Sequence, residues 1–119
     1  MAEIVWTNPA LDQLDEIAEY IALDKPEAAF GLVQAIFSSV DRLEQFPDSG
    51  HLPSELPHSI YRELYVKPCR IFYRREGNTV FIVHVMREER RLRQFLLDVA
   101  NPDLRGSQGG DQKGDADKI

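Results

Sequence analysis

The chain has 119 residues, of which 43% are hydrophobic and 29% are charged, and its formal net charge is −6. This length suits one domain with one core, and the composition is ordinary for a soluble globular protein, which argues against wholesale disorder. No apolar run approaches the roughly 20 residues that span a bilayer. The start MAEIVW also lacks the features of a secretory signal, so we expect a cytoplasmic protein without membrane association.

The charged residues are sorted along the chain. Residues 1–59 carry two basic residues against eleven acids, whereas residues 60–99 carry nine basic residues against five acids. The first segment therefore has a net charge of −9 and the second a net charge of +4. The basic segment could meet phosphates or an acidic partner helix, and the alternative is a solvated face that the acidic helices balance.

The sequence indicates no metal site and no cofactor. Cys69 is the single cysteine, so it can form no disulfide within the chain, and we interpret it as a packing residue. His51, His58 and His84 lack the short regular spacing of metal ligands on one element.

Two helices follow a short strand at residues 3–6. Asn8 before Pro9 is a strong helix start, and apolar residues at steps of three and four predict an amphipathic helix that ends near Leu23. Asp24 shortly before Pro26 repeats the start signal for a second helix, which should end at residues 46–47. A loop of a few residues between them requires an antiparallel hairpin.

Three strands are predicted next, over residues 60–66, 70–75 and 79–86. The segment 47–58 holds three prolines and a glycine and should be an irregular loop, while 67–68 and 76–78 should be turns. The strand at 79–86 is apolar enough to lie at the centre of the sheet. Residues 87–98 are helix-prone, and the glycine-rich segment 100–119 has the composition of a disordered tail.

The expected fold class is therefore α+β. It comprises a short N-terminal strand, an antiparallel two-helix hairpin packed on a twisted antiparallel four-stranded sheet, a short C-terminal helix and a disordered tail. We expect residues 1–99 to form the folded domain and residues 100–119 to form the tail.

Local residue patterns narrow the family. The chain carries six short segments in order: Trp6 before Asn-Pro-Ala-Leu-Asp-Gln-Leu, Ile17-Ala18-Glu19-Tyr20-Ile21, Pro26-Glu27-Ala28-Ala29, Phe46-Pro47-Asp48-Ser49-Gly50, Tyr61-Arg62-Glu63-Leu64 and Cys69-Arg70-Ile71-Phe72-Tyr73. Together they resemble the ParE branch of the RelE/ParE superfamily, over roughly residues 3–95. This resemblance implies the toxin of a type II toxin–antitoxin pair, whose antitoxin comes from the same operon, covers the toxin with a helix and strand, and alone contacts operator DNA.

The resemblance leaves two possible targets. ParE-like toxins poison DNA gyrase without an enzymatic step, and RelE-like toxins cleave mRNA on the ribosome. If the chain were such a metal-independent ribonuclease, Arg62, Arg70 and Arg87 would match the cations of RelE-like enzymes. Leu64 and Phe95 stand where a further sheet cation and a tyrosine would be expected, which favours the gyrase poison. An inactive antitoxin-binding module of the same fold is a third reading.

Several residues are candidates for contacts. Arg62 and Arg70 would form an anion site if both pointed to one face, and the alternative for them is pairing with Glu63 or Glu76. No local partner is evident for Arg70, so we expect it to serve function. Four closely spaced cations suggest a target-binding cluster: Arg87, Arg90, Arg91 and Arg93. Together with Arg70, they are the candidates for the target contact.

Apolar residues near the C-terminus suggest the antitoxin contact. Leu92, Phe95 and Leu96 could close the toxin's own groove and yield it to an antitoxin helix. Tyr73 is expected in the core or against the antitoxin, and Trp6 and Phe46 are expected in the core.

Overall fold

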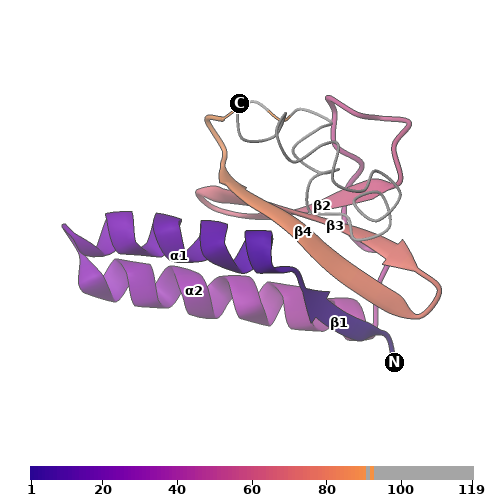
Figure 1. Ribbon diagram of the computed structural model, residues 1–119, viewed down its shortest axis with the longest axis horizontal. Helices are drawn as coiled ribbons and strands as arrows, with labels where there is room; N and C mark the ends of the chain where they lie inside the picture. The colour runs from indigo at the N-terminus through magenta and orange to yellow at the C-terminus, as the bar shows by residue number, and fades with distance from the viewer. Residues whose placement is uncertain (91, 93–119) are drawn as a thin grey trace, which may run out of the picture.

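The computed structural model describes residues 1–90 and residue 92, and these form an α+β fold of two helices against one sheet (Figure 1). The elements in chain order are β1 (Glu3–Trp6), α1 (Asn8–Ala22), α2 (Pro26–Asp41), a 3₁₀ turn η1 (Arg42–Glu44), β2 (Tyr61–Val66), β3 (Cys69–Glu76) and β4 (Thr79–Arg87). Neither helix in the described part is long and apolar enough to cross a membrane.

The sheet is mixed, with the strand order β1-β4-β3-β2. β4 pairs antiparallel with β3, and β3 pairs antiparallel with β2. The expectation of a wholly antiparallel sheet is wrong at β1, which pairs with β4 in parallel, Glu3 opposite Thr79 and Trp6 opposite Ile82. The helical hairpin causes this, because it returns the chain to the end of the sheet from which β1 started. β4 is a central strand, as its apolar composition predicts.

The N-cap residue of each helix lies one position away from the predicted one. Thr7, not Asn8, caps α1: its hydroxyl accepts a hydrogen bond from the Ala10 N–H at 3.4 Å and donates one to the Ile82 carbonyl at 2.8 Å. Thr7 thus joins the helix start to β4. Lys25, not Asp24, precedes α2 and makes no side-chain cap bond. α2 ends at Asp41, before the η1 turn, so the helix is shorter than predicted.

The main core lies between the helices and the sheet. It joins apolar residues of α1 and α2 to inward-facing residues of the strands, among them Ile36, Val40, Ile71, Tyr73, Val80 and Ile82. Trp6 packs against this core, with its ring 4.9 Å from that of Phe37, as predicted for a core aromatic. Phe46 is not a core residue, because the chain has left α2 by this point and its side chain is 60% exposed.

The opposite face of the sheet carries a second, smaller cluster. Its buried members are Tyr61, Phe72, Val83, Met86 and Leu92. Leu92 is 3% exposed and packs in this cluster. We call this the open face, because the helices lie on the other side (Figure 1).

The helix predicted over residues 87–98 does not begin where expected. Arg87 is the last residue of β4, and Glu88 and Glu89 form a turn closed by a hydrogen bond from the Arg90 N–H to the Arg87 carbonyl at 3.0 Å. The rest of that helix, apart from Leu92, and the predicted tail at 100–119 lie outside the described residues.

Candidate functional site

The three arginines that the ribonuclease interpretation requires, Arg62, Arg70 and Arg87, do not converge on one site. Cross-strand partners share a face of a sheet. Arg62 is opposite Tyr73, a residue of the main core, so Arg62 points to the helix side. Arg70 is opposite Met86 and stacks 5.0 Å from the Phe72 ring, both of which belong to the open face. The predicted joint anion site of Arg62 and Arg70 is therefore wrong.

Arg87 also points away from Arg70. Its register partner is Cys69, which is buried in the main core, so the Arg87 side chain lies on the helix side of the sheet. Its Nε donates to Glu89 Oε2 at 2.8 Å. The three cations that a ribonuclease would need at one phosphate are thus divided between two faces.

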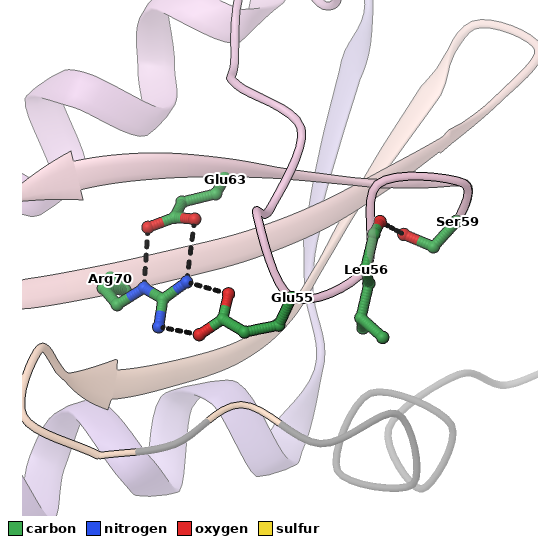
Figure 2. A network of polar contacts seen from close by, with 5 residues as sticks. All are labelled: Glu55, Leu56, Ser59, Glu63 and Arg70. Carbon is green, nitrogen blue, oxygen red and sulfur yellow. Dashed lines mark hydrogen bonds and ion pairs between the residues drawn. The ribbon is translucent and has the colours of Figure 1, made fainter.

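Arg70 is held by two carboxylates (Figure 2). Its Nε donates to Glu63 Oε2 at 2.7 Å and its Nη2 to Glu63 Oε1 at 3.0 Å. Nη1 and Nη2 donate to the two oxygens of Glu55 at 2.9 and 2.8 Å. The Arg70 side chain is 12% exposed, so this fork-shaped pairing lies mostly out of solvent. The expectation that Arg70 lacks a local partner is wrong, whereas its pairing with Glu63 agrees with the alternative.

The network ties an irregular loop to the sheet. Glu55 belongs to the segment between η1 and β2, and its hydrogen bond to Arg70 is the main reason that its pKa falls to about 2 from an ordinary 4.5. His51 adds a second tie, since it exchanges backbone hydrogen bonds with Glu63 at 2.8 and 2.7 Å. The proline-rich loop is therefore ordered by the sheet edge it covers.

A shallow pocket of ≈370 Å³ lies beside this network. It is lined by His51, Leu52, Ser54, Glu55, Glu63, Tyr65, Arg70 and Glu88. We call it the Arg70 pocket. Its walls contribute three carboxylates and one guanidinium, which makes it acidic although its strands lie in the basic segment of the sequence. Phosphate is repelled by such a surplus of negative charge.

Tyr73 is a structural residue. Its side chain is 0% exposed and its hydroxyl accepts a hydrogen bond from the Gly50 N–H at 2.9 Å, while the Gly50 carbonyl accepts one from Arg62 Nη1 at 2.9 Å. Burial raises the pKa of Tyr73. This confirms the expected core position, and it leaves Tyr73 with no surface for direct contact with an antitoxin in this conformation.

The remaining candidates lie around the end of β4. Arg90 is exposed, and Leu92 is buried against the open face. Arg91, Arg93, Phe95 and Leu96 lie outside the described residues. Among the residues that the structure describes, no group of three or more His, Cys, Asp or Glu side chains could hold a metal ion. Cys69 is 0% exposed, and burial raises the pKa of its thiol.

Sequence reasoning missed most of the pocket. The sequence pattern indicates Glu63 only as a pairing partner and does not single out Glu55, Tyr65 or Glu88 as site residues. Glu55 reaches Arg70 from an irregular loop, for which no periodicity predicts direction. Tyr65 could have been placed from the two-residue turn at 67–68, because that turn makes it the register partner of Arg70.

Comparison with known proteins places the chain among bacterial toxins. Residues 4–92 match the family described as ParE toxin of the type II toxin–antitoxin system parDE. A protein of Sinorhizobium fredii named as toxin Y4kP is 40% identical over 87 residues, which are 68% of this chain and 88% of the relative. Toxin RelE2 of Caulobacter vibrioides is 33% identical over 89 residues, which are 73% of this chain and 92% of the relative.

A solved structure shares the fold. It is described as the chromosomal ParDE toxin–antitoxin system of P. aeruginosa, and the match has a TM-score of 0.63 at 30% identity. The match covers 73% of this chain and 96% of the solved one.

Proposed function

We propose, from the premise that this chain belongs to the ParE toxin family of type II toxin–antitoxin systems, that it arrests growth by poisoning DNA gyrase. A cognate antitoxin from the same operon neutralises it in this proposal, and only that antitoxin contacts operator DNA. The site of action is the cytoplasm.

The distribution of the sheet arginines carries the choice of gyrase over mRNA. Cleavage of RNA without a metal requires cations at the reacting phosphate and groups that move a proton. Arg62 and Arg87 lie on the helix side, and Arg70 is already bound by Glu55 and Glu63. The arrangement supports a toxin that acts through contacts and not as an enzyme.

We assign the target contact to the cations that follow β4. Arg90 is exposed there, and Arg91 and Arg93 follow it in sequence. Arg70 is withdrawn from this set because its guanidinium is saturated by carboxylates, and Arg87 is engaged by Glu89. Leu92, Phe95 and Leu96 remain the proposed antitoxin contact. Leu92 already packs on the open face, and an antitoxin helix would take its place there.

The ribonuclease remains the second candidate, because one relative is named toxin RelE2. If it were correct, Arg62, Arg70 or Arg87 would have to leave its present partner to reach a phosphate. An inactive module that only binds an antitoxin is the third candidate.

The test is induction of the chain in bacteria, with the DNA damage response and mRNA integrity followed in the same culture. We expect growth arrest, broken DNA and intact mRNA. Arg90→Ala should weaken the arrest, and the matched variant Arg42→Ala, which changes an exposed arginine of η1, should not.

Each other outcome selects a different function. Codon-dependent cuts in mRNA with intact DNA would replace the gyrase poison by the ribonuclease. Soluble, folded chain that causes no arrest would leave only the binding module. Equal loss of arrest in Arg90→Ala and Arg42→Ala would remove the proposed target contact.

A further inference from the structure

The Arg70 pocket carries more negative than positive charge. Arg70 is shared by Glu55 and Glu63, so one guanidinium meets two carboxylates. Glu88, the third carboxylate of the wall, has no guanidinium or ammonium partner among the described ion pairs. Glu88 is exposed and no cation within the pocket balances its charge, so the pocket attracts cations.

The hydrogen bonds of the wall leave acceptor capacity for that cation. Glu88 Oε1 accepts a hydrogen bond from the Tyr65 hydroxyl at 2.7 Å, which fixes the carboxylate at the rim. An ionised carboxylate offers about four lone-pair sites, so Glu88 can still accept a forked pair of N–H donors. The carboxylate also raises the pKa of Tyr65, so the phenol stays protonated as the donor.

The pocket also offers an apolar wall. Leu52 is 52% exposed and Tyr65 is 50% exposed, and both line the cavity. Lysine and arginine have apolar stems and a charged end, so one such side chain can lie along Leu52 and Tyr65 while its charge reaches Glu88. A volume of ≈370 Å³ falls within the range of small ligand sites.

A second feature of the same face points to a missing partner. His84 lies beside Phe72 with 6.1 Å between the ring centres, and Phe72 in turn carries Arg70 at 5.0 Å. His84 is 7% exposed, yet its Nδ1 atom has no hydrogen-bond partner in the described part of the chain. Buried polar atoms are nearly always paired, so an unpaired one on this face is consistent with an interface that is incomplete in the free chain.

We propose that the Arg70 pocket receives an arginine or lysine side chain of the antitoxin, held by Glu88 and the Glu55–Arg70–Glu63 network. This inference rests on the antitoxin partner of the proposed function and does not depend on the toxin's target. It reverses the expectation that the basic segment meets an acidic partner helix, because the partner here supplies the positive charge.

The first test uses the purified chain and N-acetyl-arginine amide as the probe. We expect a saturable shift of the backbone amide signals of Leu52, Tyr65 and Glu88 in NMR spectra, reduced by salt. Glu88→Gln keeps an acceptor for Tyr65 but removes the charge, so it should weaken the apparent affinity about threefold. Glu89→Gln is the matched control, because Glu89 pairs with Arg87 outside the pocket, and it should leave the affinity unchanged.

The second test measures the antitoxin itself. Glu88→Lys should lower the affinity of the full-length toxin for its antitoxin at least tenfold, while Glu89→Lys should change it less than threefold. Restoring the affinity of Glu88→Lys with an acidic residue in place of one antitoxin arginine or lysine would identify the inserted side chain.

Several results would overturn the inference. Inorganic phosphate that shifts the same amides more strongly than the arginine probe would make the pocket an anion site. Self-association of the free toxin that Glu88→Gln abolishes would give the pocket to a second copy of the chain. Probe binding without any effect of Glu88→Lys on the antitoxin would refute the assigned occupant, and the gyrase experiment would be unaffected by all three.

Discussion

Position 50, the last residue of the segment 46–50, has room only for a glycine. A Cβ atom at this position would lie 2.7 Å from the Tyr73 ring and hydroxyl and 2.9 Å from the Glu63 carbonyl oxygen. No side chain fits there without moving a buried tyrosine or a strand. The glycine is therefore required by close approach, since the loop must come near enough for its N–H to reach Tyr73.

Gly50→Ala should lower the free energy of unfolding by about 2 kcal/mol, because it introduces a clash at a buried position. Ser49→Ala, at an exposed position next to it, should change stability by less than about 0.5 kcal/mol. Urea denaturation of both variants checks this. Equal stability of the two would show that the loop moves freely away from Tyr73.

His84 makes stability depend on pH. Burial lowers its pKa to about 4 from an ordinary 6.5, so the folded chain holds it neutral where the unfolded chain protonates it. The stability that the fold has while His84 is neutral is fully present above about pH 6.5 and is lost as the pH falls towards about 4. The largest effect is about 3 kcal/mol.

His84→Gln should therefore flatten the stability profile between about pH 6.5 and pH 4, because glutamine does not titrate. His58→Gln, which changes an exposed histidine, should keep the profile of the parent chain. The measurement is the free energy of unfolding across this range. An unchanged slope in His84→Gln would assign the pH dependence to carboxylates.

The predicted anion site of Arg62 and Arg70 fails because the two side chains point to opposite faces of the sheet, and not because arginine is the wrong residue type. The turn at residues 67–68 already sets Tyr65 opposite Arg70. Arg62 is three positions from Tyr65, and an odd offset places two side chains on opposite faces of a strand. The opposite orientation could thus be predicted from the sequence. The salt bridge to Glu55 could not, because a loop without a repeat gives no direction to its side chains.

At the level of elements, α1 completes the sheet where β1 stops. β1 ends opposite Ile82, but β4 continues to Arg87. Beyond that point the Gln13 side chain of α1 accepts a hydrogen bond from the Val85 N–H at 2.8 Å. The helix therefore replaces the absent strand as the partner of this backbone group.

Gln13→Ala should lower the free energy of unfolding by about 1–2 kcal/mol, since it leaves the Val85 N–H without its partner. Hydrogen exchange at the Val85 amide should also become faster. Asp12→Ala on the exposed side of α1 is the control and should affect neither quantity. If Val85 exchanged at the parent rate in Gln13→Ala, water would be an adequate substitute.

Element type was predictable for the segments that have a clear local pattern. The apolar spacing of residues 8–22 and the apolar composition of 79–86 determined a helix and a central strand. Gly77 has a positive φ of 60°, which the first central position of a type II′ hairpin requires. A glycine at this position therefore predicts the turn. The parallel direction of β1 depends on how the hairpin returns to the sheet, which no local pattern encodes.

For the whole molecule, the charge division of the sequence does not become a division of surfaces. The basic segment supplies β2, β3 and β4, but carboxylates of the loop before β2, of β2 itself and of the turn after β4 surround Arg70. A net charge counted over a stretch of sequence averages over both faces of every strand. The acidic pocket is visible only once those faces are separated.

The parallel pairing of β1 with β4 has a consequence for synthesis on the ribosome. Glu3 pairs with Thr79, so the first strand waits for nearly all of the described chain before it finds its neighbour. Until β4 leaves the exit tunnel, the apolar sides of α1 and α2 have no completed sheet to cover them. The nascent chain is thus exposed to aggregation and to early capture until β4 emerges, and the described fold assembles in one late step.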